Sequence, residues 1–217
     1  MKKTLLLFGI VLILSVSTSV IPVLISCKSQ VPKVLLFIRD GSGENLEFML
    51  TKEVGTMRGI LEQSGFDVII ATVSGEVIKA DSTTITPHIK LGEVNVDDYA
   101  GFIFPCMAAE SFHQEAVALV NKIVEKNKPI AAQLGSVVLL GKAGVLNGKK
   151  YAFPKNDIDN PDMYPELKSG IYSGNGVVQD GNIITSGMCP MMEKLRGQKD
   201  GTIELTQKLI QKIKAGT

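Results

Sequence analysis

Short, largely apolar runs that recur along the chain, each followed by residues with helical spacing, limit the fold most strongly. The runs cover residues 34–38, 67–72, 101–105 and 130–133. Continuous apolar runs of this length are typical of parallel strands that are buried on both faces of a sheet. Strands that alternate with helices along a chain build a mostly parallel sheet between two helix layers. We therefore expect an α/β fold, a three-layer sandwich of the flavodoxin-like type.

The stretches between the runs have the pattern of amphipathic helices. Over residues 45–64, apolar side chains recur at roughly helical spacing, and Gly65 suits the C-terminal cap of that helix. Ser111 and Gln114 form a candidate capping box for a helix that ends before Pro129.

The rest of the chain continues the alternation. Helices are expected over residues 137–143 and 202–215, a hairpin with a turn at Asp180 and Gly181 over residues 177–185, and a hairpin-like excursion over residues 74–98. The sequence contains no internal repeat and no boundary after residue 33. A single domain over residues 34–217 is therefore expected.

The first residues have the pattern of a secretion signal. Lys2 and Lys3 precede an apolar stretch that continues, diluted by Ser and Thr, to residue 25. Leu24-Ile25-Ser26-Cys27 resembles the lipobox of bacterial lipoproteins, in which the chain is cut before the Cys and the Cys carries a lipid. We expect a signal peptide over residues 1–26, a lipid on Cys27, a tether to residue 33, and a position in the cell envelope outside the cytoplasm. The alternative is an uncleaved spanning helix, which Pro22 disfavours.

Charge and motif patterns argue against several classes of protein. Lys plus Arg is 23 and Asp plus Glu is 22, so the chain has no basic surplus for nucleic acid. No Cys or His pairs have zinc spacing. Gly41-Ser42-Gly43 lacks the third glycine of a dinucleotide loop, and the acidic residues 157–162 contain Pro161 and lack the glycine of a calcium loop. The sequence predicts no cofactor and no metal.

Four segments, taken in order, resemble the DJ-1/PfpI family of the glutamine-amidotransferase-like superfold. They are KVLLFI followed by a turn and Glu44-Asn45-Leu46-Glu47, residues 99–105 (YAGFIFP), residues 128–132 (KPIAA) continuing to residues 143–150 (AGVLNGKK), and residues 180–187 (DGNIITSG). The resemblance covers about residues 33–215. It implies a reactive Cys at a sharp strand-to-helix turn, tuned by a nearby carboxylic acid, and activity as a hydrolase, a glyoxalase-type lyase or a redox-sensing chaperone. Members often form homodimers, so a second copy is an implied partner.

The resemblance also implies that the reactive Cys is missing here. The ungapped match places Leu134 at the nucleophile position and Gly135 directly after it. Glu47 is the matching acid, with Glu44 as its substitute, and Cys106-Met107 replaces the usual Gly-Gly pair. We expect a non-catalytic domain that binds a small molecule or a protein in a pocket near Glu47, Cys106, Leu134, Gly135 and Cys189.

Three alternatives stay open from the sequence. Cys106 is a candidate displaced nucleophile, with Glu47 as its hydrogen-bond partner, in an atypical hydrolase, glyoxalase-type or redox protein. Cys106 and Cys189 are candidates for a disulfide, which conditions outside the cytoplasm permit, or else are two buried thiols. Ser136 is a candidate nucleophile or, more simply, a helix N-cap. Methionines near these positions line a pocket or fill the core.

Overall fold

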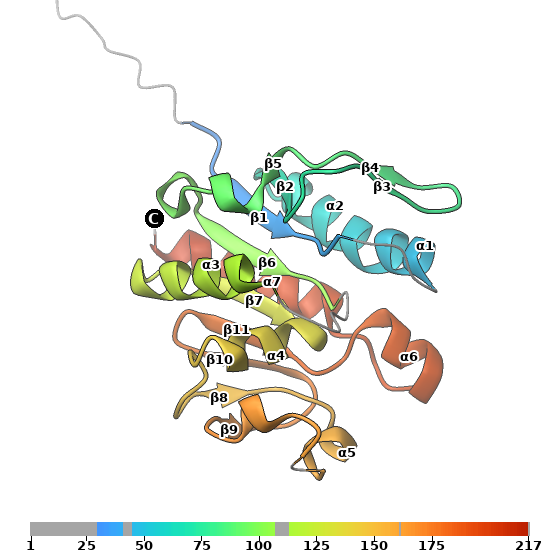
Figure 1. Ribbon diagram of the computed structural model, residues 1–217, viewed down its shortest axis with the longest axis vertical. Helices are drawn as coiled ribbons and strands as arrows, with labels where there is room; N and C mark the ends of the chain where they lie inside the picture. The colour runs from blue at the N-terminus through green and yellow to red at the C-terminus, as the bar shows by residue number, and fades with distance from the viewer. Residues whose placement is uncertain (1–29, 41–44, 107–112, 161, 217) are drawn as a thin grey trace, which may run out of the picture. The chain divides into compact units, whose positions relative to one another are not determined.

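A computed structural model describes residues 30–40, 45–106, 113–160 and 162–216. Within these residues a seven-stranded sheet has the order β10-β11-β7-β6-β1-β2-β5 (Figure 1). All neighbouring pairs are parallel except β10 and β11, so the predicted mostly parallel sheet is confirmed. The strands are β1 (Lys33–Phe37), β2 (Asp67–Thr72), β5 (Ile89–Lys90), β6 (Gly101–Phe104), β7 (Ile130–Gln133), β10 (Val177–Asp180) and β11 (Ile183–Ser186).

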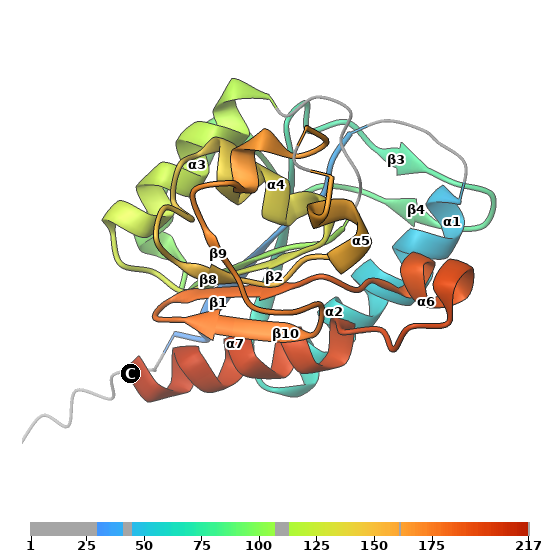
Figure 2. The ribbon, with the colours of Figure 1, turned by 90° about the horizontal axis from the view of Figure 1, so that it is seen from below.

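Helices cover both faces of the sheet. Figure 2 shows α3 (Gln114–Glu125) and α4 (Gly135–Lys142) on one side, and α2 (Gly55–Gln63) and α7 (Thr202–Gly216) on the other. Side chains of β1 alternate between the two layers: Leu35 packs with the α3 and α4 side, and Leu36 with the α2 and α7 side. The central strands β1 and β6 bury both faces, which explains their apolar sequences, and the predicted three-layer sandwich is confirmed.

Several helices begin or divide at other residues than the sequence predicted. The helix expected over residues 45–64 is α1 (Leu46–Met49), a π-helical turn (Leu50–Val54) and α2 in succession. Helix α4 begins at Gly135, two residues before the predicted start. Among the described residues, no side chain caps α3 at His113, and Ser111 of the predicted capping box lies outside them.

Short strands, helices and turns lie between the main elements of the sheet. Strands β3 (Ile78–Lys79) and β4 (Thr84–Ile85) pair antiparallel in the expected excursion, whereas β5 joins the main sheet. The hairpin β10–β11 turns at Gly181, where φ is 62°, as the Asp-Gly signal predicted. The sequence did not predict β8 (Lys150–Tyr151), β9 (Ile171–Tyr172), α5 (Lys155–Ile158), α6 (Pro190–Arg196) or the 3₁₀ turns Leu91–Glu93, Val96–Asp98 and Pro165–Leu167.

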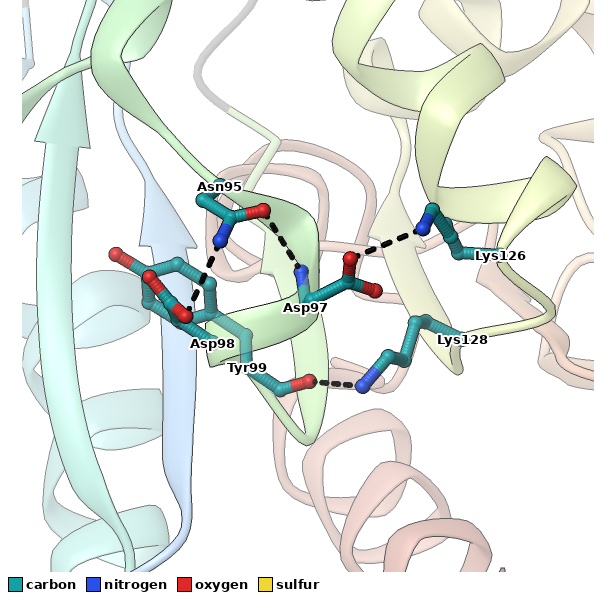
Figure 3. Close-up of polar contacts among 6 residues, drawn as sticks. All are labelled: Asn95, Asp97, Asp98, Tyr99, Lys126 and Lys128. Atoms are coloured by element: carbon teal, nitrogen blue, oxygen red, sulfur yellow. Dashed lines mark hydrogen bonds and ion pairs between the residues drawn. The ribbon is translucent and has the colours of Figure 1, made fainter.

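A polar cluster joins the segments that precede β6 and β7 at the amino edge of the sheet (Figure 3). Lys126 Nζ lies 2.9 Å from Asp97 Oδ2, and Lys128 Nζ donates to the Tyr99 carbonyl at 2.8 Å. Asn95 accepts from the Asp97 N–H and donates to Asp98, which fixes the turn before β6. These lysines therefore have structural partners and do not form a free basic patch.

The carboxyl ends of the parallel strands meet at the opposite edge, and α1 and α6 lie beyond them (Figure 1). The chain runs from β1 outward to β2, and later returns to β6 on the other side of β1. Ligand sites of open α/β sheets gather outside the carboxyl ends of strands at such a reversal. Pro105 and Cys106 follow β6 at this edge, and Leu134 follows β7.

The predicted signal peptide, Cys27, Glu44 and Met107 lie outside the described residues. Within the described part of the chain, no helix combines the length and the apolar character that crossing a membrane requires.

Candidate functional site

A strained turn joins β7 to α4 at Leu134. This residue has φ 41° and ψ −100°, a conformation that a leucine adopts at a cost of about 1–3 kcal/mol. Its N–H donates to the Ser186 carbonyl at 2.7 Å, which ties the turn to the end of β11. The turn at residues 133–135, called the elbow below, therefore has the sharp strand-to-helix geometry that the sequence comparison implied for a reactive residue. A leucine side chain offers no nucleophilic atom there.

Cys106 lies beside the elbow, at the end of the neighbouring strand β6. Its side chain is 4% exposed. Its backbone N–H donates to Glu53 Oε1 at 2.6 Å, and the N–H of Gly135 points to its thiol. The Cys106 thiol donates a hydrogen bond to the sulfur of Cys189. That bond and burial both raise the pKa of the Cys106 thiol, so this Cys stays protonated near neutral pH.

Cys189 meets Cys106 from the loop that leads into α6. It is 0% exposed, it precedes Pro190 at the start of α6, and its thiol is hydrogen-bonded to that of Cys106. That hydrogen bond and the N–H groups of Met192 and Met191 lower the pKa of Cys189. Both residues are free thiols within the described part of the chain. The disulfide stays a prediction, and the thiols that would form it are in contact.

Glu53 is the carboxylic acid of this site, in place of the predicted Glu47. It is 0% exposed and lies in the π-helical turn. Its Oε2 atom has no hydrogen-bond partner among the described residues. Burial, followed by the charge of Cys189, raises the pKa of Glu53 well above its usual value, which favours the neutral carboxyl group.

Glu47 binds the segment between β3 and β4 and not the thiols. Its carboxylate accepts hydrogen bonds from the N–H and hydroxyl groups of both Ser82 and Thr83, at 2.5 to 2.9 Å. These bonds lower the pKa of Glu47 to about 2. The prediction that Glu47 partners Cys106 is corrected accordingly: Glu47 fastens the β3–β4 hairpin to α1. Its substitute Glu44 lies outside the described residues.

The sequence did contain a signal for Glu53. Met49 and Met57 lie four residues before and after it, so Glu53 falls on the apolar stripe of the predicted helix. A carboxylate within such a stripe is either paired or functional. The π-helical turn adds one residue locally, and both Glu53 and Val54 turn inward as a result.

A buried hydrogen-bond network holds the loop that carries Cys189. The Met188 carbonyl accepts from Gln133 Nε2, from the Ser186 hydroxyl at 3.0 Å and from the Gly201 N–H at 3.2 Å. Gln133 also exchanges hydrogen bonds with the Thr202 hydroxyl. The loop backbone next to Cys189 is therefore fixed to β7, β11 and the start of α7.

The two thiols belong to a buried group of sulfur-bearing side chains. The sulfur cluster consists of Cys106, Met188, Cys189 and Met192, and the partly buried Met49, Leu134 and Met191 pack against it. The structure thus brings together the predicted site residues Cys106, Leu134, Gly135 and Cys189, and leaves Glu47 apart. Because both thiols are almost completely buried, only a small reagent has access to them.

Two other features lie outside the sulfur cluster. Ser136 is inside α4, where its hydroxyl donates to the Pro105 carbonyl at 2.5 Å. Leu134, not Ser136, is the residue at the N-cap position, so the N-cap interpretation of Ser136 was wrong. A cavity of about 590 Å³ lies near the ends of β1 and β2, and its lining includes Asp40, Ser74 and His113 but no residue of the sulfur cluster.

Comparison with known proteins places the chain in a family. The model of the DJ-1/PfpI family matches residues 32–197. An uncharacterized protein of Methanocaldococcus jannaschii is 32% identical over 135 residues, which are 58% of this chain and 63% of that protein. The match therefore covers less than two thirds of that relative. A deglycase of Thermococcus kodakarensis is 27% identical over 122 residues, 54% of this chain and 69% of the deglycase.

Solved structures show the same fold. A ThiJ/PfpI domain protein from Brachyspira murdochii matches with a TM-score of 0.64 at 14% identity, over 85% of this chain and 98% of that one. DJ-1beta of Drosophila melanogaster matches with a TM-score of 0.53 at 22% identity, over 86% and 97%. At these identities the likeness concerns the fold alone. The family match over residues 32–197 confirms the resemblance first drawn from the sequence, and the chain belongs to the DJ-1/PfpI family.

Proposed function

We propose that this chain is a thiol-redox protein in which the reactive centre has moved from the elbow to the pair Cys106 and Cys189. The contact between the two thiols carries this proposal. The opposite pKa shifts of the pair give it one thiolate-forming member, Cys189, and one protonated member, Cys106. Pairs of this asymmetric kind suit reversible disulfide chemistry, because the thiolate attacks and the second thiol resolves the product.

The proposed oxidant is a small hydroperoxide, since the site is buried. The Cys189 thiolate attacks the peroxide, an S–O bond forms, and the O–O bond breaks. The departing oxygen takes a proton from the neutral carboxyl group of Glu53, which solvent then restores. Cys106 attacks the resulting sulfenic acid, an S–S bond forms, and the proton of Cys106 leaves with the hydroxide as water. The net change is two thiols and one hydroperoxide to a disulfide, an alcohol and water.

The membrane position is part of the same proposal. A lipid on Cys27 would hold the domain outside the cytoplasm, where disulfides persist. It would also remove the third Cys from thiol chemistry and leave Cys106 and Cys189 as a pair. Metabolic labelling with a fatty acid, lost in Cys27→Ser, tests this part separately.

Leu134 favours a second candidate, a non-catalytic domain that binds a small molecule or protein. Without a nucleophile at the elbow, the deglycase activity of relatives is not expected here. The two candidates differ in their thiol chemistry. A binding domain would have inert core thiols, whereas a redox protein must form its disulfide under mild oxidation.

The test uses the reduced full chain with Cys27 lipidated or replaced by Ser. One equivalent of hydrogen peroxide should lower the intact mass by two hydrogen atoms. In Cys106→Ser, the same treatment should leave a sulfenic acid on Cys189 that dimedone captures. If both thiols survive excess peroxide unchanged in the folded protein, the redox function is wrong and the binding domain is favoured.

A further inference from the structure

We propose that the sulfur cluster is a binding site for a soft monovalent metal ion, Cu(I), held by the thiolates of Cys106 and Cys189 with thioether support from Met188 and Met192. The four side chains form one buried cluster and are 0–8% exposed. Thiolate and thioether sulfur are the donors that select Cu(I) among biological metal ions. This inference does not depend on redox cycling of the pair.

The available ligands argue against harder ions. Across the described ranges, no group of three or more His, Cys, Asp or Glu side chains is placed to share an ion. Zinc is bound by three or four such ligands, and calcium and magnesium need several oxygens. Cu(I) is satisfied by two or three sulfur atoms. The donor set at this site, two cysteines and two methionines, therefore matches Cu(I) better than any divalent ion.

The contact between the thiols supplies the geometry. The Cys106 and Cys189 side chains are already hydrogen-bonded, so an ion can replace the shared proton without bringing together distant elements. On binding, both S–H protons leave and two Cu–S bonds form. The two thiolates carry two negative charges and Cu(I) carries one positive charge, so the bound centre has a net charge of −1.

The surroundings stabilise that charge. The N–H of Gly135 points to the Cys106 sulfur, and the N–H groups of Met191 and Met192 point to that of Cys189. The Met188 carbonyl, held by three hydrogen bonds, fixes the loop that carries two of the proposed ligands.

The test is a competition for Cu(I) between the reduced full chain, with Cys27 lipidated or replaced by Ser, and a chromophoric Cu(I) chelator under anaerobic conditions. We expect one Cu(I) per chain. Cys106→Ser and Cys189→Ser should each weaken binding by more than the roughly 10–100-fold that outer-shell changes cost, and Met188→Leu or Met192→Leu by about tenfold. Met163→Leu is the matched control, because Met163 is 51% exposed and lies outside the cluster.

Two further measurements keep the result unambiguous. Thermal unfolding of each variant without metal should show a folded protein, and X-ray absorption at the copper edge should show sulfur neighbours alone. Retention of Cu(I) by the chelator, or equal binding by wild type and Cys189→Ser, would overturn the proposal. Cu(I) binding in a protein that forms no disulfide would support this site and reject the redox function. Disulfide formation without Cu(I) binding would support the redox function and reject the Cu(I) site.

Discussion

The backbone N–H of Cys106 donates a 2.6 Å hydrogen bond to Glu53 Oε1, which joins the end of β6 to the π-helical turn. The bond places a buried carboxyl group next to a buried thiol pair. One oxygen of that carboxyl group is left without a partner among the described residues. Buried polar atoms are normally paired, and exceptions gather at functional sites.

Glu53 should make the stability of the protein fall as pH rises. Its folded pKa lies well above 4.5, so the folded state binds the proton more tightly than the unfolded state. The contribution of Glu53 to the free energy of unfolding is complete below about pH 4.5. It is lost as pH rises from there to the folded pKa, at a rate of up to about 1.4 kcal/mol per pH unit. Urea unfolding across this window should show the decline in wild type and a weaker one in Glu53→Gln. Parallel pH profiles for the two proteins would contradict the assignment of a neutral Glu53.

Glu47 should affect the β3–β4 hairpin and leave the thiols unchanged. In Glu47→Ala, the N–H groups of Ser82 and Thr83 lose their acceptor, so their hydrogen exchange should accelerate. In the wild type, the protection of these N–H groups, taken relative to the intrinsic exchange rate at each pH, should likewise fall as pH approaches 2, because the folded pKa of Glu47 lies at about 2. Alkylation rates of Cys106 and Cys189 should match those of the wild type. A change in the alkylation rate of either thiol in Glu47→Ala would show that Glu47 belongs to the thiol site.

Removal of the Cys106 thiol should raise the pKa of Cys189. The hydrogen bond from Cys106 is the largest contribution to the lowered pKa of Cys189. In Cys106→Ala that donor is gone, whereas a hydroxyl in Cys106→Ser can replace it. Ultraviolet thiolate absorbance as a function of pH measures the shift. We expect Cys189 to titrate at higher pH in the Ala variant than in the Ser variant, and equal titrations would show that the two side chains do not interact.

Gly201→Ala should disturb the loop that carries Cys189. A Cβ atom at this position would overlap Ser186 Oγ and would lie 3.3 Å from the Met188 carbonyl oxygen. Overpacking of this kind costs about 1–3 kcal/mol of unfolding free energy. Gly59→Ala in α2 is the matched control, because its Cβ position has no described atom within 4 Å apart from its chain neighbours and the backbone of its own helix. There the helix should gain about 0.5–1 kcal/mol. Chemical denaturation of both variants measures these effects. A Gly201→Ala protein as stable as the control would show that the loop yields easily.

The sheet could be predicted from the sequence because its central strands are buried on both faces. In β1 and β6 nearly every residue is apolar, and this leaves few alternatives to a parallel sheet between helices. The paired strands β3–β4 and β8–β9 have two residues each, too few to show a period. Their positions depend on tertiary contacts that the local sequence does not encode.

The site could be predicted only in part. Leu134 at the elbow and the approach of Cys106 to Cys189 came from the family resemblance, because residues so far apart in sequence carry no spacing signal. Glu47 was chosen by its place in the motif, and a π-helical turn that regular helical periodicity does not anticipate brought Glu53 to the thiols instead. The carboxylate between Met49 and Met57 was the available clue.

Redox titration of the thiol pair tests the central claim most directly. The full chain, with Cys27 lipidated or replaced by Ser, is equilibrated in mixtures of reduced and oxidised dithiothreitol, then alkylated and mapped by mass spectrometry. We predict that Cys106 and Cys189 change together in one two-electron transition, and that the oxidised protein yields a single peptide linked through these residues. Alkylation of the two thiols independently, with no linked peptide at any ratio, would contradict the claim that they act as a pair.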